Sequence, residues 1–276
     1  MTRRLVPYLQ VLPLTLVFAA FVIFLYGPIL TIVVLSFQGP NGGLVFPLRG
    51  VSTHWFQALF GPQAIGDIWG AFHRSFGLGL MVMGLTVLLA FLAGIALRRR
   101  FRGATLLFYV VVVASLIMPS VVVSLGIGAG FELLGIDRSW NGSALGANLT
   151  WTVPFGLLIM FAVFSRFDPA YEEAARDEGA SGWQTIRYVV LPIVAPSLIG
   201  VALFGFTLSY DELARISQAV GAVNTLPLEL QAMQSNATTP MINALGTLTT
   251  ALSLAIVAVT LAAVFVLGRR RLSRQA

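Results

Sequence analysis

Six stretches of this sequence are long and apolar enough to cross a bilayer as helices, and they restrict the fold more than any other feature does. The hydrocarbon core of a membrane needs about 20 mostly apolar residues per helix, and inside it every backbone N–H and C=O must be paired, which favours helices. With 57% hydrophobic and 10% charged residues, the composition agrees. We predict an all-α integral membrane protein with six transmembrane helices. They run approximately over residues 11–37, 76–97, 104–131, 149–167, 190–209 and 242–267.

Prolines interrupt two of these spans. Pro119 lies in the third span, and Pro192 and Pro196 lie in the fifth. Membrane helices tolerate such prolines where neighbouring groups pair the freed carbonyls. The basic N-terminus resembles the start of a signal peptide, but the apolar stretch that follows exceeds the usual length of about 7 to 15 residues. We interpret it as an uncleaved first span, with cleavage as the minor alternative.

Arginine placement predicts the orientation of the spans. The chain has no lysine, and thirteen of its 17 arginines lie before span 1, after span 2, between spans 4 and 5, or after span 6. Since cytoplasmic loops carry the excess of basic residues, both termini and the loop between spans 4 and 5 are expected in the cytoplasm. The arginines form short clusters beside apolar runs and not a patch with aromatics, so no nucleic-acid binding is expected.

This chain lacks the residues that several kinds of chemistry require. Without lysine there is no GxxxxGK[ST] phosphate loop, so energy from a nucleotide would have to come from another subunit. Without cysteine there is no disulfide or thiolate chemistry, and His54 and His73 do not have the spacing of a zinc site. No Gly-x-Ser-x-Gly motif occurs. We therefore predict no catalytic residue and no metal site.

A strongly polar passage lies between spans 4 and 5. Asp168 followed by Pro169 favours a helix start, since Asp can cap free N–H groups and Pro fits the first turn. Residues 169–178 are predicted to be helical, with Gly179 at the C-terminal cap. Ser181 can cap a second helix that leads into span 5. From these residues alone, both a docking surface for a partner and an ordinary solvated loop stay open.

The second candidate site is the sequence SYDEL at the end of span 5. Ionisable residues at the membrane edge are costly and often functional. If they line a pathway, Ser209, Tyr210, Asp211 and Glu212 would suit a cationic or zwitterionic amine through charge and cation–π attraction. The alternative is an intrahelical ion pair of Asp211 or Glu212 with Arg215.

The polar passage resembles the EAA signature of the membrane subunits of bacterial binding-protein-dependent ABC importers. That signature reads Glu-Ala-Ala, three residues, Gly, nine residues, and then Ile-x-Leu-Pro. All spacings are intact, and Val189 replaces the usual Ile. The other matching positions are Glu173, Ala174, Ala175, Gly179, Leu191 and Pro192.

The resemblance extends over about residues 50–265 to the branch of permeases that includes the second membrane subunit of spermidine/putrescine importers. It rests on STHWFQALFG, SRFDPAYEEAARDEGAS, GFTLSYDELARIS, TLPLELQAM and INALGTLTTALSL. It implies a MetI-like permease fold. Residues 1–70 would form the first helix and a periplasmic segment, residues 71–267 the ABC type-1 core with a cytoplasmic coupling loop at 167–189, and residues 268–276 a basic cytoplasmic tail.

The same resemblance implies the function and the partners. The chain would be a non-enzymatic, multi-pass permease of the bacterial inner membrane. Its coupling loop would dock on two copies of an ATPase subunit, which would bind ATP and Mg while this chain binds no cofactor. A second permease, expected to be a paralogue, and a periplasmic binding protein would complete the importer. The best candidate for the solute is a polyamine or a related amine.

Other solutes and one other transport class remain alternatives. Permeases of this kind also serve amino acid derivatives, phosphonates and inorganic ions. An ATP-independent secondary transporter would usually show internal repeats or charged residues inside several spans, and the sequence shows neither. A membrane-embedded enzyme would need a nucleophile or a metal constellation, and no such motif occurs.

Overall fold

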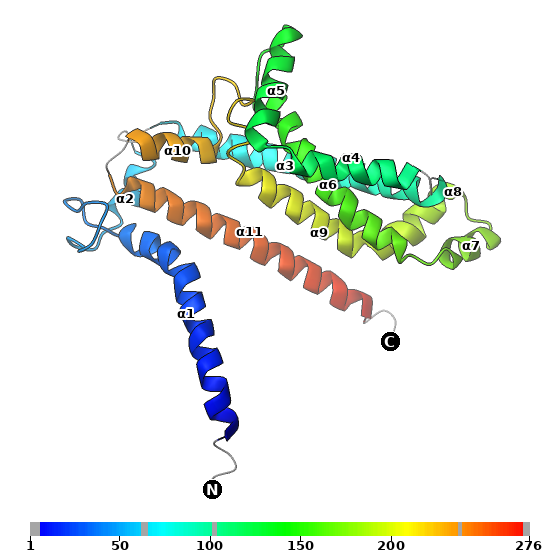
Figure 1. Ribbon diagram of the computed structural model, residues 1–276, viewed down its shortest axis with the longest axis horizontal. Coiled ribbons are helices and arrows are strands. Elements are labelled where there is room, and N and C mark those ends of the chain that lie inside the picture. Colours follow the sequence, from blue (N-terminus) through cyan, green and yellow to red (C-terminus); the bar gives the residue numbers. More distant parts are fainter. Residues whose placement is uncertain (1–5, 62–65, 101–103, 237–238, 273–276) are drawn as a thin grey trace. The chain divides into compact units, whose positions relative to one another are not determined.

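The computed structural model describes residues 6–61, 66–100, 104–236 and 239–272 (Figure 1). Parts of the predicted basic clusters lie outside the described residues, including Arg3, Arg4, Arg102 and Arg274. All regular elements of the described ranges are helices, and one isolated bridge joins Gln38 to Val51. The predicted all-α class is therefore confirmed.

The chain divides into two compact units. One comprises Met1–Ile68 and Leu230–Leu252, and the other comprises Trp69–Glu229 and Ser253–Ala276. The boundaries between the units fall within α10 (Leu226–Asn236) and α11 (Met241–Leu272) and after the first residue of α3 (Ile68–Arg100).

The first unit contains α1 (Val6–Leu35) and the short α2 (His54–Ala58). Between them, the fully buried side chain of Gln38 closes a loop. Its Oε1 accepts a hydrogen bond from the backbone N–H of Arg49 at 2.6 Å, and its Nε2 donates to the carbonyl of Gly43 at 3.1 Å. A buried amide that uses both its donor and its acceptor fixes the loop after the first span.

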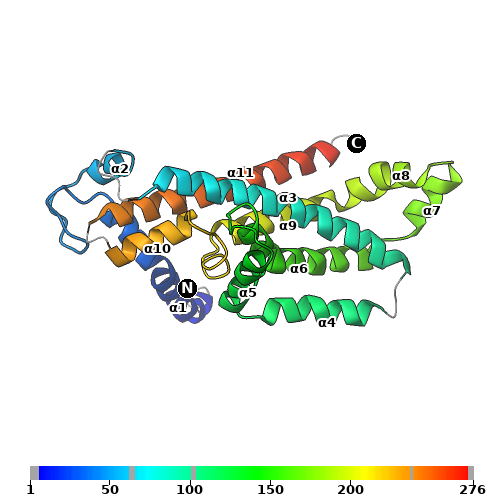
Figure 2. The ribbon, with the colours of Figure 1, turned by 90° about the horizontal axis from the view of Figure 1, so that it is seen from above.

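The second unit is a helical bundle. It contains α3 (Ile68–Arg100), α4 (Ala104–Ile117), α5 (Ser120–Leu133), α6 (Ser143–Ser165) and α9 (Leu191–Tyr210). Helix α6 packs against α4, α5 and α9, and Figure 2 shows α5 turned away from the direction that α4, α6 and α9 share. The polar α7 (Ala170–Asp177) and α8 (Gly182–Thr185), with the π-helical segment η2 (Ile186–Val190), connect α6 to α9.

Five of the described helices are long and apolar enough to span a membrane. The sixth candidate is the pair α4 and α5, which bend by 99° at the break between them. The predicted third span is thus interrupted far more sharply at Pro119 than a kinked helix would be. Pro119 has an extended backbone, with ψ of 127°, and it cannot donate the N–H that would continue α4. The described residues therefore contain five candidate spans, or six if α4 and α5 together form one broken span.

Small residues let the helices of the bundle approach closely. A Cβ atom added to Gly156 of α6 would lie 3.0 Å from Thr86 and 3.1 Å from both Ala90 and Val201. The Thr86 hydroxyl also donates to Thr152 at 3.0 Å. Close packing through small residues and hydroxyl pairs is a main source of helix association in membranes. Gly156 therefore sets the spacing of α3, α6 and α9.

We expect Gly156→Leu to destabilise the bundle, because even an added methyl group would press on its neighbours and a branched side chain needs far more room. Overpacking of this kind costs about 1–3 kcal/mol. Thermal unfolding of the detergent-purified protein measures the loss. Gly200→Leu is the matched control, because Gly200 of α9 is exposed and nothing lies within 4 Å of its added Cβ. Equal midpoints for the two variants would contradict the packing role.

Candidate functional site

The polar passage between α6 and α9 folds as its capping residues predict. The Asp168 carboxylate accepts a hydrogen bond from the backbone N–H of Ala170 at 3.0 Å, and α7 follows from Ala170 to Asp177 with Glu172 and Glu173 in its first turn. Acidic residues near a helix N-terminus are favoured by the helix dipole. The predicted helix is confirmed, one residue shorter at each end than the predicted range.

Gly179 makes the turn that ends α7. Its φ is +84°, a conformation that costs glycine little and other residues more. The N–H of Gly179 donates to the carbonyl of Arg176 at 2.8 Å, and the N–H of Ala180 donates to Ala175 at 3.0 Å. These bonds satisfy the last carbonyls of the helix, so the predicted glycine cap is confirmed.

Ser181 starts the second polar helix through a reciprocal cap. Its hydroxyl accepts from the N–H of Gln184 at 3.3 Å, and the Gln184 side chain accepts from the N–H of Ser181 at 2.7 Å. This capping box uses two otherwise free donors. The partner role of Gln184 and the π-helical turn before Leu191 were missed at the sequence level, although a Ser followed three residues later by Gln is a recognisable signal.

The signature residues differ in exposure. Glu173, Ala174 and Gly179 are exposed, Ala175 is partly buried, and a Cβ added at Gly179 would meet nothing within 4 Å. Glu172 is instead buried and forms an ion pair with Arg176 at 3.6 Å. The outward face of α7 and its glycine turn are therefore free within this chain to accept another surface. Figure 1 shows α7 and α8 together at one end of the second unit.

Leu191 and Pro192 lie where the polar pair joins the membrane helix. Leu191 is partly exposed, and Pro192 is partly buried in the first turn of α9. The π-helical segment ends directly before them. π-turns interrupt α-helices often at functional sites. These two residues thus connect the α7–α8 pair to α9 without lying on the outward face of α7.

At the other end of α9 lies the second candidate site. Ser209 and Tyr210 are buried, and the Ser209 hydroxyl accepts a hydrogen bond from Asn148 of α6 at 3.0 Å. Asp211, directly after the helix, is exposed at the residue level. Partial desolvation of its carboxyl group raises the pKa of Asp211 above its ordinary value. Glu212 is buried. Of the four predicted pathway residues, Asp211 is the one that another molecule can reach in this conformation.

The alternative interpretation of this site, an intrahelical ion pair with Arg215, does not agree with the structure. Helix α9 ends at Tyr210, before both carboxylates. Glu212 accepts a hydrogen bond from the backbone N–H of Arg215 at 2.7 Å. The Arg215 side chain extends elsewhere, to the Thr150 hydroxyl at 2.8 Å. The helical periodicity that suggested the pair does not continue past Tyr210.

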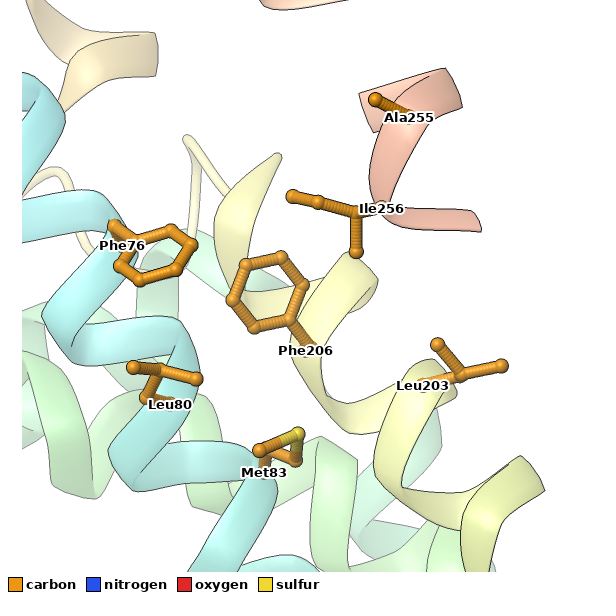
Figure 3. Close-up of a pocket in the computed structure, with 7 residues that line it drawn as sticks. All are labelled: Phe76, Leu80, Met83, Leu203, Phe206, Ala255 and Ile256. Atoms are coloured by element: carbon orange, nitrogen blue, oxygen red, sulfur yellow. The ribbon is translucent and has the colours of Figure 1, made fainter. Parts of the chain in front are cut away.

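An apolar cavity of about 280 Å³ lies between α3, α9 and α11 (Figure 3). Phe76, Met83, Phe206 and Ile256 are among its lining residues, and none of the side chains that line it carries nitrogen or oxygen. A charged or strongly polar solute would lose its hydration there without gaining a partner. The cavity is therefore not the place where such a solute binds. Among the described residues, no group of three or more His, Asp or Glu side chains could hold a metal ion.

A bundle of apolar helices, a solvent-facing polar helix pair at one end and a carboxylate at the other define a multi-pass membrane subunit with the layout of a transport permease. The chain belongs to the family of binding-protein-dependent transport system inner membrane components, whose sequence pattern matches residues 86–274. This match confirms the resemblance that the EAA signature indicated.

Individual relatives and a solved structure agree with this family. The chain is 32% identical to the spermidine/putrescine transport system permease protein PotC of Haemophilus influenzae over 241 residues, which cover 85% of this chain and 89% of that protein. It is 30% identical to the putrescine transport system permease protein PotI of Escherichia coli K12, with 82% and 81% covered.

A chain in the crystal structure of a bacterial ABC transporter for the import of alginate has a similar fold. The TM-score is 0.65 at 18% identity, and the match covers 95% of this chain and 96% of that one. The predicted MetI-like permease fold is thereby confirmed. The predicted relation to the spermidine/putrescine branch is confirmed by the identities to PotC and PotI.

Proposed function

We propose that this chain is the membrane-spanning subunit of an ATP-driven importer that carries a polyamine or a related cationic or zwitterionic amine. The observation that carries the proposal is the homology to PotC and PotI over most of the chain. The exposed Asp211 beside Glu212 supports the amine, because two carboxylates at a membrane edge attract a cation. Another small solute, such as an amino acid derivative, a phosphonate or an inorganic ion, is the alternative, and an ATP-independent transporter is a weaker one.

The α7–Gly179–α8 structure serves in this proposal as the coupling contact with a cytoplasmic ATPase. The docking face consists of exposed Glu173, Ala174 and Gly179. At Ala174 and Gly179 little or no side chain stands in the way of a partner. Two ATPase copies would bind ATP and Mg, so this chain itself hydrolyses nothing. Closure of the ATPase pair would move the α7–α8 structure as a rigid body.

The remaining partners follow from the family, whose members are inner membrane components of binding-protein-dependent systems. A loaded periplasmic binding protein would deliver the solute at the end of the second unit that carries Asp211. A second permease, a paralogue of this chain, would complete the pathway. Both termini and the α7–α8 pair would then face the cytoplasm, in agreement with the arginine distribution.

We expect Gly179→Asp to lower uptake by at least about tenfold while the subunit stays in the membrane and the ATPase continues to hydrolyse ATP. An added Cβ meets nothing in this chain, but the positive φ of Gly179 strains any side chain there. The part of the effect that exceeds this strain falls on the docking contact, where about 1.4 kcal/mol corresponds to tenfold. Uptake and ATP hydrolysis by the reconstituted importer measure the two activities.

Gly179→Asn is the matched control, since Asn and Asp have similar size and both tolerate positive φ. A larger loss with Asp than with Asn isolates the effect of the charge. Unaltered uptake with Asp would overturn the coupling role of this turn.

We expect Asp211→Asn to lower spermidine or putrescine uptake by about tenfold, because an attraction of roughly 1–4 kcal/mol between charges near a protein surface is removed. Reconstituted importer with its loaded binding protein gives the rate. Glu212→Gln tests the second carboxylate separately, since the amide oxygen can still accept the N–H of Arg215. Asp137→Asn is the control, because Asp137 is another exposed aspartate of the same unit. Equal uptake by the Asp211 and Asp137 variants would leave Asp211 without a role in the pathway.

A further inference from the structure

The break between α4 and α5 is a sharp elbow, formed by residues 118–120, where the two helices bend by 99°. Pro119 supplies no N–H to bridge the break, so side chains from other elements must hold the elbow in place. Ser120, the first residue of α5, provides a hydroxyl at this point.

Arg215 reaches this hydroxyl from the chain segment that follows α9. Its Nη2 donates to the Ser120 hydroxyl at 3.3 Å, and its Nη1 donates to the Thr150 hydroxyl of α6 at 2.8 Å. The guanidinium also lies over the Trp151 ring, 5.3 Å from its centroid. Arg215 is only 2% exposed. Burying a guanidinium is costly unless its donors are paired. Here Nη1 and Nη2 are paired with α6 and the elbow, while Nε is buried without a hydrogen-bond partner.

The segment that Arg215 belongs to carries the two carboxylates of the candidate site. We name residues 211–221 the carboxylate segment. The backbone N–H of Arg215 itself donates to Glu212 at 2.7 Å, so one residue holds a carboxylate with its main chain and the elbow with its side chain. A planar guanidinium with several fixed donors is suited to joining separate elements in one geometry.

Other bonds hold the far part of the same segment. The backbone N–H of Gln218 donates to the Ser124 hydroxyl of α5 at 2.9 Å, and the Ser143 hydroxyl of α6 donates to the carbonyl of Ala219 at 2.6 Å. These bonds lie further along the chain from Asp211 and Glu212. Arg215 makes the tie nearest to the carboxylates and the one that reaches the elbow.

We propose that Arg215 is a positioning residue, which holds the carboxylate segment against both the elbow and α6 so that Asp211 and Glu212 keep a fixed place relative to the two. A movement of the elbow relative to α6 would break this arrangement and displace the carboxylates. This inference rests on the proposed role of the carboxylates in the amine pathway. The tie itself is a geometric statement that does not depend on the identity of the solute.

The chain has no native cysteine, so Val122→Cys in α5 and Leu213→Cys in the carboxylate segment give this subunit two unique labelling sites. Val122 is exposed and Leu213 is partly exposed, and Leu213 lies between the carboxylates and Arg215, before the bond from Gln218 to Ser124. In the assembled importer, with thiols removed from the partner subunits, pulsed dipolar EPR between nitroxides at these positions should show a narrow distance distribution. We expect Arg215→Met to broaden it and Arg215→Lys to restore part of the narrowing, because an ammonium can still reach one hydroxyl.

Ser217→Ala is the matched control, since the Ser217 hydroxyl donates to the carbonyl of Ala214 within the same segment at 2.9 Å. It should leave the distribution unchanged. An Arg215→Met distribution as narrow as the parent's overturns the proposal. If Arg215→Met does not assemble, Ser120→Ala decides, because it removes only the hydroxyl at the elbow: broadening supports the tie and a parent-like distribution overturns it.

The functional readout is the number of solute molecules moved per ATP hydrolysed by purified, assembled importer. A merely structural arginine would lower the yield of importer and leave this ratio unchanged, whereas a positioning residue lowers the ratio in Arg215→Met, with partial rescue by Arg215→Lys. An unchanged ratio in Arg215→Met overturns the positioning role. If the unmutated importer moves no amine at all, the proposed substrate is wrong, and the EPR comparison still tests the tie at Arg215.

Discussion

Backbone hydrogen bonding without water is the constraint on which the rest of this structure depends. In a bilayer a helix satisfies its own N–H and C=O groups, so an apolar stretch of about 20 residues has little choice of conformation. A proline inside such a stretch removes one of those bonds. At Pro119 the result is a break in the helix. At Pro154 of α6 the freed carbonyl of Thr150 accepts a hydrogen bond from the Ser115 hydroxyl, which lies just before the break, and Ser120 just after it receives a bond from Arg215. Side chains on both sides of the elbow therefore join it to other elements.

Several polar side chains of α6 form hydrogen bonds with other elements of the second unit, which explains the central place of this helix. Asn148 reaches the end of α9, Thr150 receives Arg215, and Thr152 pairs with Thr86 of α3. Each polar side chain in an apolar bundle needs such a partner, since a free one costs about 1–3 kcal/mol. The same contacts that satisfy these groups also fix the register of α3, α6 and α9. Gly156 lies on this helix one turn further on and permits the close approach that the bonds require.

Features that depend on nearby residues could be predicted from the sequence, whereas features that depend on distant residues could not. Apolar length predicted the five described helices that are long enough to span a membrane. Capping chemistry predicted α7, the Gly179 turn and the start at Ser181, because these depend on neighbours within four residues. The sharp elbow at Pro119 and the role of Arg215 depend on residues tens of positions away, so no local pattern contains them. The ion-pair interpretation of Glu212 and Arg215 assumed that α9 continued past Tyr210, and the helix end lies where only tertiary contacts decide it. Similarly, the burial of Ser209 follows from its contact with Asn148.

The two candidate sites are connected by one helical element. From Gly182 to Tyr210 the chain is continuously helical over 29 residues, which corresponds to about 43 Å at 1.5 Å per residue. The Gly179 turn lies just before its start and Asp211 directly after its end. A displacement of the α7–α8 pair therefore reaches the carboxylate segment along a single rod, without needing a chain of side-chain contacts. The regular hydrogen-bond ladder of this rod is interrupted at η2 by the π-turn and at Pro192 and Pro196 by the missing N–H groups. Bending at these interruptions would absorb part of the movement, so the amplitude that arrives at Asp211 depends on how firmly α6 holds the rest of α9.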